Sequence, residues 1–406
     1  TWGHYTTKDF IHYEDFGPVV FPDEDIDAHG VYSGSAFIED DTIHYFYTGN
    51  LKYFDRDDYD YINNGRGSNT ITFTSKDGYE FTKKELLMTT DDYPADMSNH
   101  VRDPKIFKKN EKYYMVLGAR DVEGVGMILL YESTDLKNWT YKNRITTPQK
   151  FGYMWECPDL FEMDGQLYII CCPQGVETQG IDYENVHQVT AMKLDYDFDT
   201  DEYEITDIKL FDRGFDFYAP QTFEDESGRR ILIGWMGIPD ADYTNPTEAG
   251  WQHALTIPRE LSVRDGKLIQ EPIEELKQLR SEDKAVCTFC YGQTIIMQNA
   301  IYEALVDFKR CREMVMTLRE GITLSYKDNI LTLNLGVYGS GRSTRKVRLE
   351  KLEHLQIFAD TSSLEIFVNH GEEVFTTRIY NHYGRLLING ECSGIMTVYP
   401  LKSFEI

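Results

Sequence analysis

Long apolar runs are missing from this sequence, although 41% of its 406 residues are hydrophobic. A helix that crosses a bilayer needs about 20 consecutive apolar residues, and no segment approaches that length. No secretory signal is visible at the start of the chain either. These two absences argue against an integral membrane protein and against a membrane partner.

Positive charge is also scarce, because 41 Lys and Arg residues face 68 Asp and Glu residues and leave a formal net charge of −27. A surface this acidic repels phosphate backbones and anionic lipid, so nucleic acid is excluded as a partner. A phosphorylated small molecule would need a local basic pocket to overcome this field.

Cysteine is limited to seven residues, an odd number. Cys171 and Cys172 lie in an apolar, strand-like run and are expected to be buried thiols. Cys287 and Cys290 form a lone C-x-x-C, whereas a zinc site would need a second pair. We therefore expect free thiols, a reducing compartment such as the cytoplasm, and no metal. A phosphate-cradling glycine-rich loop is missing as well, so no cofactor is predicted.

Aromatic residues are abundant at 14% of the chain, with 28 Tyr and 22 Phe. Aromatic side chains pack well on pleated surfaces, so this composition favours β structure. Their faces also stack on the apolar faces of sugars. Most of them are explained more simply as the cores of many short strands.

An internal repeat organises the first two thirds of the chain. One motif ends in Phe and is followed by a polar turn and an aromatic-aliphatic strand; it recurs at 32–37, 102–107, 156–161 and 218–223. A second motif, S/T-x-D-x-x-x-aromatic, recurs between them at 7–13, 75–81 and 133–139. Two elements repeating in the same order every 55–70 residues or so predict a β-propeller. The alternative is an irregular β-sandwich whose turns resemble one another by coincidence.

The order of the repeat shows how the chain is organised. The chain opens in the second motif, near the end of a repeat, so we expect a five-bladed β-propeller whose first blade is incomplete at the N-terminus. We assign the propeller to residues 1–270. Helical spacing in 271–280 predicts a short helix within a linker at 271–284.

Beyond the linker the repeat vanishes, and residues 285–406 contain about six short runs of alternating polarity. Such runs predict an antiparallel β-sandwich. Nothing in this domain looks catalytic. We expect it to brace the propeller, in a protein that is a monomer or a homodimer.

Residues at the same position of each repeat should converge at one end of the propeller channel. Aligning Phe107 with Phe161 places Asp103 and Glu156 on adjacent blades at almost the same height. Two carboxylates that face one pocket are what glycoside hydrolysis requires. The alternative is that Arg102 and Asp103 form a structural ion pair while Glu156 caps a turn.

The neighbours of these two carboxylates suggest different roles. Glu156 lies between Trp155 and Cys157, and such an apolar setting should raise its pKa, as a general acid needs. Asp103 follows Arg102, which should keep it ionised and able to stabilise positive charge in the transition state.

The same residues carry a resemblance to a known family. Arg102-Asp-Pro resembles an RDP motif and Glu156-Cys-Pro an ECP motif. Five further segments resemble motifs of the same family; they lie at 32–36, 215–221, 235–237, 255–261 and 364–369. Seven motifs in the right order resemble glycoside hydrolase family 32, the β-fructosidases, over essentially the whole chain.

This resemblance implies a five-bladed propeller followed by a β-sandwich, and a retaining hydrolase that releases fructose. The substrate would be a small carbohydrate, with sucrose 6-phosphate favoured over sucrose or a short fructan. Glu156 would be the acid/base and Asp103 the transition-state stabiliser. The substrate-binding residues would be Arg102, Tyr32, Ser33, Trp155, Trp235, Asp216 and Cys157, the last of which would tune the neighbouring acid.

One family motif is not found. The family nucleophile is an Asp in a W-M-N-D-P-N-G-like motif upstream of a W-G-H segment, which Trp2-Gly3-His4 matches, and the 406 residues contain no such motif. Two interpretations follow: either the sequence begins downstream of the true start, or the chain is an inactive fructoside-binding relative. An arabinan-type hydrolase of similar architecture is a third reading, disfavoured by the sandwich.

Overall fold

The structure is a computed structural model of residues 1–406, and it describes all of them except 244, 245, 247, 249, 293, 298, 299, 382 and 383. The chain divides into two units, and each is described by itself. The first comprises residues 1–5, 15–176 and 187–209, and the second comprises 6–14, 177–186 and 210–406.

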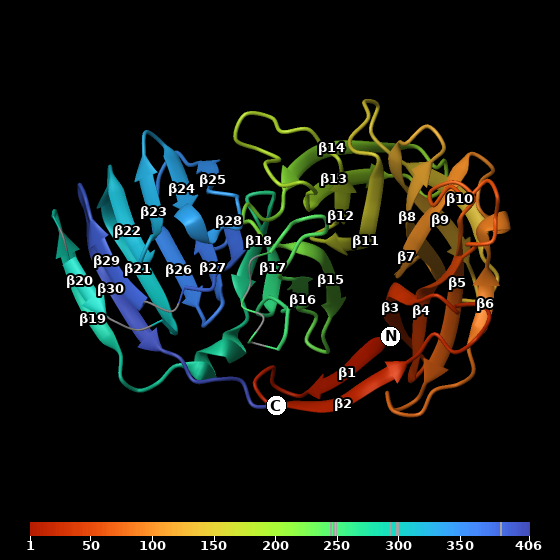
Figure 1. Cartoon of the computed structure of the whole chain (residues 1–406), viewed down its shortest axis with the longest axis horizontal. Helices are drawn as coiled ribbons and strands as arrows, with labels where there is room; N and C mark the ends of the chain where they lie inside the picture. Colours follow the sequence, from red (N-terminus) through yellow and green to blue (C-terminus); the bar gives the residue numbers. More distant parts are fainter. Residues whose placement is uncertain (244–245, 247, 249, 293, 298–299, 382–383) are drawn as a thin grey trace. The chain divides into compact units, whose positions relative to one another are not determined.

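The first unit is built from four-stranded antiparallel sheets that follow one another along the chain (Figure 1). Each sheet uses its strands in chain order, so that neighbours are joined by short hairpins. Three such sheets lie within the described residues of this unit. They are β3 (Val31–Glu39), β4 (Thr42–Lys52), β5 (Arg66–Ser75) and β6 (Glu85–Met88); β7 (Met97–Lys109), β8 (Lys112–Asp121), β9 (Gly126–Ser133) and β10 (Thr140–Ile145); and β11 (Met154–Met163), β12 (Gln166–Gln174), β13 (Thr190–Tyr196) and β14 (Tyr203–Leu210).

The apolar run of β8 is explained by burial on both faces. Met115 and Leu117 pack in a cluster with Phe46 of β4, whereas Tyr114 and Val116 pack on the other side against residues of β11 and β12. A strand that is covered on both sides needs apolar residues at every position rather than at alternate ones. This packing holds the three sheets face to face.

The S/T-x-D motif forms the turn between the third and fourth strands. The Ser75 hydroxyl accepts the N–H three residues later at 2.9 Å, and Asp77 Oδ1 accepts the next two N–H groups, both at 2.9 Å. Ser133 and Asp135 repeat this pattern at 3.0, 2.9 and 2.8 Å. Side chains that satisfy the backbone of a tight turn in this way hold its shape. The predicted polar turn is confirmed.

The same turn at residues 7–13 joins β1 (Trp2–Thr7) to β2 (Tyr13–Val20) in a two-stranded sheet. In the complete sheets this turn links the two outermost strands. The pair β1–β2 therefore corresponds to the outer half of a blade, as the repeat predicted.

The second unit contains one more four-stranded sheet and a short helix. The sheet is formed by β15 (Tyr218–Glu224), β16 (Arg230–Trp235), β17 (Arg259–Arg264) and β18 (Lys267–Pro272). The helix predicted at 271–280 is a 3₁₀ helix at Glu274–Leu279, while residues 271 and 272 complete β18. A 3₁₀ helix superimposes side chains three residues apart, which buries Leu276 and Leu279 together.

The rest of the second unit is two antiparallel sheets of six strands each, counted over the described residues. One has the order β19 (Ala285–Cys290), β30 (Cys392–Pro400), β21 (Tyr302–Cys311), β26 (His354–Ala359), β27 (Ser363–Val368) and β28 (Glu373–Arg378). The other has the order β20 (Thr294–Met297), β29 (Gly384–Asn389), β22 (Met314–Arg319), β23 (Ile322–Lys327), β24 (Ile330–Asn334) and β25 (Thr344–Arg348). Among the described residues of the whole chain, two further 3₁₀ turns occur at Thr90–Asp92 (η1) and Gly336–Tyr338 (η4).

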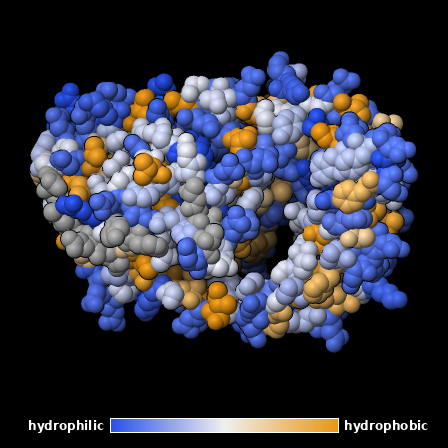
Figure 2. All heavy atoms as spheres, in the orientation of Figure 1, coloured by the Kyte–Doolittle hydropathy of each residue, from blue (hydrophilic) through white to orange (hydrophobic). Residues whose placement is uncertain are grey.

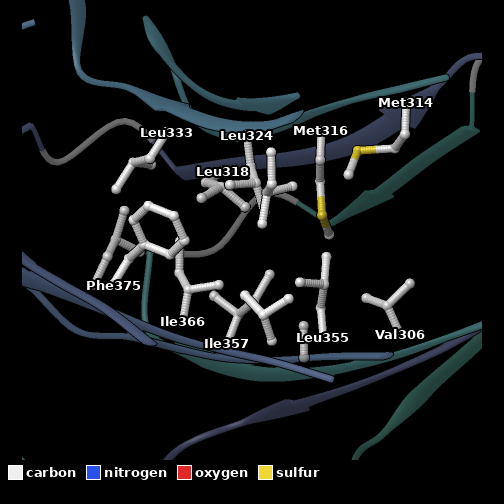
Figure 3. Close-up of a cluster of buried hydrophobic side chains, with 14 of the residues drawn as sticks. Val306, Met314, Met316, Leu318, Leu324, Leu333, Leu355, Ile357, Ile366 and Phe375 are labelled. Atoms are coloured by element: carbon white, nitrogen blue, oxygen red, sulfur yellow. The ribbon is translucent and has the colours of Figure 1, made fainter. Parts of the chain in front are cut away.

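Apolar side chains from the two six-stranded sheets point toward one another and fill the space between them (Figure 3). Met316 and Leu324 come from one sheet, and Ile357 and Ile366 from the other; all four are fully buried. This interdigitated layer is the core of a sandwich.

We expect Met316→Ala to lower the free energy of unfolding by about 2–5 kcal/mol, because it leaves a cavity in this core. The neighbouring Val315 is 46% exposed on the opposite face of β22, so Val315→Ala is the matched control. Denaturant unfolding of both variants measures the difference. Equal losses would mean that β22 does not bury one face as described.

The face of the molecule in Figure 2 is mostly hydrophilic, with hydrophobic residues scattered over it. This agrees with the net charge of −27. Within the residues that the structure describes, no helix is long and apolar enough to cross a membrane.

Candidate active site

The innermost strand of each sheet is interrupted at its motif. The pairing register shifts between Val31 and Gly34 in β3, between Arg102 and Lys105 in β7, and between Glu156 and Asp159 in β11. A bulge adds an unpaired residue and redirects the side chains beside it. The proline of the RDP and ECP motifs, which has no N–H to donate, falls inside the bulge, where no ladder hydrogen bond is required.

Two motif residues adopt the left-handed conformation that favours glycine. Asp103 has φ = 65° and Cys157 has φ = 48°, and Ala219 at the same repeat position in the second unit has φ = 47°. Such a backbone costs about 1–3 kcal/mol per residue and persists only where surrounding contacts enforce it. This strain recurs at the second residue of each of these three motifs, which makes that position a candidate functional position.

Backbone and side-chain hydrogen bonds join the inner strands to one another. The Cys157 N–H donates to Asp103 Oδ2 at 2.9 Å, and the Asp103 N–H donates to the Thr48 hydroxyl at 3.0 Å. Ser35 donates to the Pro104 carbonyl at 2.8 Å. These contacts bring Asp103 of β7 next to the residue that follows Glu156 in β11.

Arg102 joins the two carboxylates. Its Nε donates to Glu156 Oε1 at 3.2 Å, its Nη2 contacts the same oxygen, and Nε lies 4.0 Å from Asp103 Oδ2. Gln174 donates to the other Glu156 oxygen at 2.8 Å. The closer partner of Arg102 is thus Glu156 rather than its sequence neighbour Asp103, and Glu156 does not merely cap a turn.

Burial dominates the electrostatics of this cluster. Burial raises the pKa of Asp103, although Arg102 opposes the shift. The expectation that Arg102 alone keeps this carboxyl ionised therefore understated desolvation, which disfavours the charged form. Burial lowers the pKa of Arg102, but Glu156 and Asp103 more than offset this, so the net pKa is raised and the guanidinium stays charged.

His100 completes the chain of contacts on the other side of Arg102. Arg102 Nη1 lies 2.8 Å from His100 Nδ1. Because a guanidinium can only donate, this ring nitrogen is the acceptor and carries no proton. Burial, followed by the charges of Arg102, Arg66 and Arg120, lowers the pKa of His100 to about 2, so the ring is neutral.

The side chains that flank Glu156 have supporting positions. A hydrogen bond with Cys172 and burial raise the pKa of Cys157 well above its usual value, which keeps the thiol protonated. Trp155 is fully buried, and its indole N–H donates to the Phe151 carbonyl at 2.7 Å. The ring of Trp155 therefore packs in the core behind Glu156, away from any exposed surface.

The remaining predicted residues divide between the two units. In the first, Tyr32 is half-buried on β3 and Ser33 is exposed. In the second, Trp235 packs against the rings of Tyr218 and His253 at 6.4 and 5.4 Å.

Asp216, also in the second unit, is fully buried and accepts four hydrogen bonds within that unit. The donors are Tyr243 at 3.0 Å, Arg342 at 2.9 Å, Thr377 at 3.0 Å and the Arg378 N–H at 2.8 Å. A carboxylate with both oxygens engaged in this way acts as a structural anchor within its unit.

Sequence reasoning did not identify His100, Gln174 or Arg66. His100 stands two residues before the RDP motif, so its proximity in the sequence was a usable signal. Gln174 ends the strand that pairs with the ECP strand, and only the register of β11 with β12 brings it to Glu156. Arg66 begins β5 with no motif around it.

Comparison with known proteins independently supports the family resemblance that the RDP and ECP motifs carry. The sequence model of the Glycosyl hydrolases family 32 N-terminal domain matches residues 1–272, and that of the family 32 C-terminal domain matches residues 282–397. The sucrose-6-phosphate hydrolase of Staphylococcus xylosus is 37% identical over 399 residues, which cover 93% of this chain and 78% of that protein. That of Bacillus subtilis strain 168 is 35% identical, covering 97% and 83%.

Solved structures agree with these matches. The sucrose-6-phosphate hydrolase of Lactobacillus gasseri superimposes with a TM-score of 0.87 at 27% identity, covering 99% of this chain and 85% of that one. A family 32 β-fructofuranosidase of Bombyx mori gives 0.84 at 27% identity, covering 100% and 85%. The four-stranded sheets are thus those of a β-propeller and the six-stranded sheets those of a β-sandwich, as the sequence predicted.

Proposed function

This chain belongs to glycosyl hydrolases family 32, and on that premise we propose that it is a β-fructofuranosidase that releases fructose from sucrose 6-phosphate. One observation carries the proposal. Glu156 and Asp103 come from neighbouring strained bulges and are joined through Arg102 and the Cys157 N–H. Two carboxylates held this closely on different strands can act on opposite sides of a glycosidic bond.

Glu156 is the acid/base in this proposal. It protonates the glycosidic oxygen as glucose 6-phosphate leaves, and it then accepts a proton from the water that releases fructose from the nucleophile. Arg102 holds one of its oxygens and Gln174 the other, so the carboxyl cannot rotate freely. A fixed orientation is what efficient proton transfer requires.

Asp103 is the transition-state stabiliser. Its charge lies in a buried setting, where an electrostatic interaction with an oxocarbenium-like fructosyl group is stronger than in water. The Cys157 N–H and Arg102 hold this charge in place before the substrate arrives. Arg102, Tyr32 and Ser33 would contact the fructosyl group.

A retaining mechanism also needs a carboxylate nucleophile. The family resemblance assigns it to an Asp of a W-M-N-D-P-N-G-like motif, which residues 1–406 do not contain. Glu156 and Asp103 would supply the acid/base and the transition-state stabiliser. The experiment that tests the proposal therefore compares proteins with and without the nucleophile segment.

The test compares fructose release from sucrose 6-phosphate and from sucrose by residues 1–406 and by the same residues preceded by an inner-strand N-D-P segment. We expect turnover when the N-D-P aspartate is present, with higher kcat/KM for the phosphorylated substrate. If neither chain turned over while both bound fructosides, the fructoside-binding alternative would replace the enzyme.

We also propose the domain limits 1–270, 271–284 and 285–406, which lie close to the limits of the two family matches. The cytoplasm is proposed as the site of action, in keeping with the free thiols of Cys171, Cys287, Cys290, Cys311 and Cys392. A monomer and a homodimer are both compatible with this proposal, and sedimentation equilibrium would separate them.

A further inference from the structure

Arg66, the first residue of β5, is a buried cation with an unusual environment. It is 1% exposed, and its guanidinium lies 5.5 Å from the centre of the Tyr32 ring and 5.3 Å from that of Tyr61. Nη1 donates to the Tyr61 hydroxyl at 3.1 Å. Its Nε and Nη2 are also buried, and neither has a hydrogen-bond partner among the described residues.

The other fully buried arginines, Arg259 and Arg319, have more partners than Arg66, although the Nε of each also lacks a hydrogen bond among the described residues. Arg259 donates to Asp212 and Glu365, and the guanidinium of Arg319 donates to four backbone carbonyls. Arg66 forms no ion pair with any residue that the structure describes. Burying a charge without a counter-charge is unfavourable, and a bound anion would offset that cost.

The Nε and Nη2 atoms of Arg66 form one edge of its guanidinium. Arg102 uses its own Nε and Nη2 edge to bind Glu156, and Arg56 binds Asp58 through the same edge at 3.0 and 3.0 Å. This edge matches the spacing of two oxygens on a carboxylate or phosphate. In Arg66 neither atom of this edge forms a hydrogen bond with an acidic side chain among the described residues.

The position of Arg66 connects it to the candidate active site. Its charge and those of Arg102 and Arg120 all act on His100, which contacts Arg102 directly. Arg120 packs over the Tyr153 ring at 5.1 Å, and its Nε is buried without a partner among the described residues. Two arginines without carboxylate partners thus adjoin the pair Arg102–Glu156 in a chain of net charge −27.

We propose that Arg66 recognises the phosphate of sucrose 6-phosphate, with Arg120 adding positive charge beside it. This inference rests on the proposed function. The phosphate is carried on the glucosyl C6, a few bonds from the oxygen that Glu156 protonates. Tyr61 is 41% exposed, and the phosphate reaches the Nε–Nη2 edge of Arg66 when the Tyr61 ring moves aside and its hydroxyl releases Nη1.

The first test is substrate specificity in Arg66→Gln. We expect the ratio of kcat/KM for sucrose 6-phosphate to that for sucrose to fall at least about tenfold, since a charge-assisted bidentate contact is lost. Arg144→Gln is the matched control, because Arg144 lies in the same unit but is paired with Asp96 at the surface. An unchanged ratio in Arg66→Gln would overturn the inference.

The second test measures binding without turnover. Calorimetry with glucose 6-phosphate and with glucose should show that the phosphate strengthens binding to the unaltered protein and no longer does so in Arg66→Gln. If the protein bound glucose 6-phosphate through Arg66 but did not hydrolyse sucrose 6-phosphate, only the proposed function would fail. Equal binding of glucose 6-phosphate by both proteins would overturn the inference alone.

A third variant covers the case in which Arg66→Gln does not fold. Tyr61→Phe removes the hydrogen bond to Nη1 that holds the ring in place, while keeping the ring beside Arg66. It should tighten glucose 6-phosphate binding several-fold and leave glucose binding as it was. Weaker or unchanged binding of glucose 6-phosphate would contradict the proposed displacement.

Discussion

Replacing Glu156 with Gln is expected to lower kcat for sucrose 6-phosphate by about 10²–10⁴-fold, the usual contribution of general acid–base catalysis. Gln has nearly the same shape and can still accept from Arg102, but it cannot donate and recover a proton. The loss should therefore fall on kcat far more than on KM. Steady-state kinetics on the catalytically active protein measures kcat and KM, and a melting curve shows whether each variant is folded.

The matched control for this variant is Glu162→Gln. Glu162 lies on the same strand, β11, but is 38% exposed at its far end and pairs with Lys109. It should keep the kinetics of the unaltered protein. If Glu156→Gln hydrolysed sucrose 6-phosphate at the normal rate, Glu156 would be a structural ligand of Arg102 and the acid would have to be sought elsewhere.

Replacing Asp103 with Asn is expected to lower kcat/KM by about 10²-fold or more, because a preorganised charge beside the reacting centre is removed. The backbone contact survives, since the Asn carbonyl can accept the Cys157 N–H in place of Oδ2. The variant should therefore fold normally, and its defect should appear in the chemistry.

Its stability should move in the direction opposite to its activity. Burial raises the folded-state pKa of Asp103, so the folded protein binds this proton more tightly than the unfolded chain. The stabilising contribution of this carboxyl is fully present below its pKa in the unfolded chain. It is lost as the pH rises through its pKa in the folded protein. Asn has no such loss, so the melting temperature of Asp103→Asn relative to the parent should rise from about pH 4 toward neutrality.

Asp96→Asn tests that sign. Arg144 lowers the pKa of Asp96 through a direct hydrogen bond, so this carboxylate stabilises the folded state above its unfolded pKa and loses that effect as the pH falls. Its removal should lower the melting temperature at neutral pH. A similar fall in Asp103→Asn would show that Asp103 stabilises the fold rather than straining it.

Several features of the site could be read from the sequence because they are local or periodic. The S/T-x-D motifs form the predicted turn since all their hydrogen bonds lie within five residues. The repeat placed Asp103 and Glu156 at almost the same height of successive inner strands, and the structure brings these strands together.

Other features depend on contacts that no local pattern encodes. About half of the sandwich strands were not predicted, including β19, β21 and β22. Their residues do not alternate clearly between polar and apolar, and their places in the sheets depend on partners such as β30 and β29, which lie far away in the sequence. The 3₁₀ helix at Glu274–Leu279 replaced the predicted helix since packing of two leucines three residues apart outweighed helical propensity.

The repeated blades, their turns, the sandwich class and the nearness of the two carboxylates could be predicted from the amino-acid sequence, because periodic polarity and short motifs are properties of neighbouring residues. Three features followed only from the packed sheets: Arg102 binds Glu156 more closely than Asp103, desolvation raises the pKa of Asp103, and Arg66 is buried with no ion-pair partner among the described residues. Charge pairing and desolvation depend on which distant strands enclose a side chain, and that is known only once the sheets have packed.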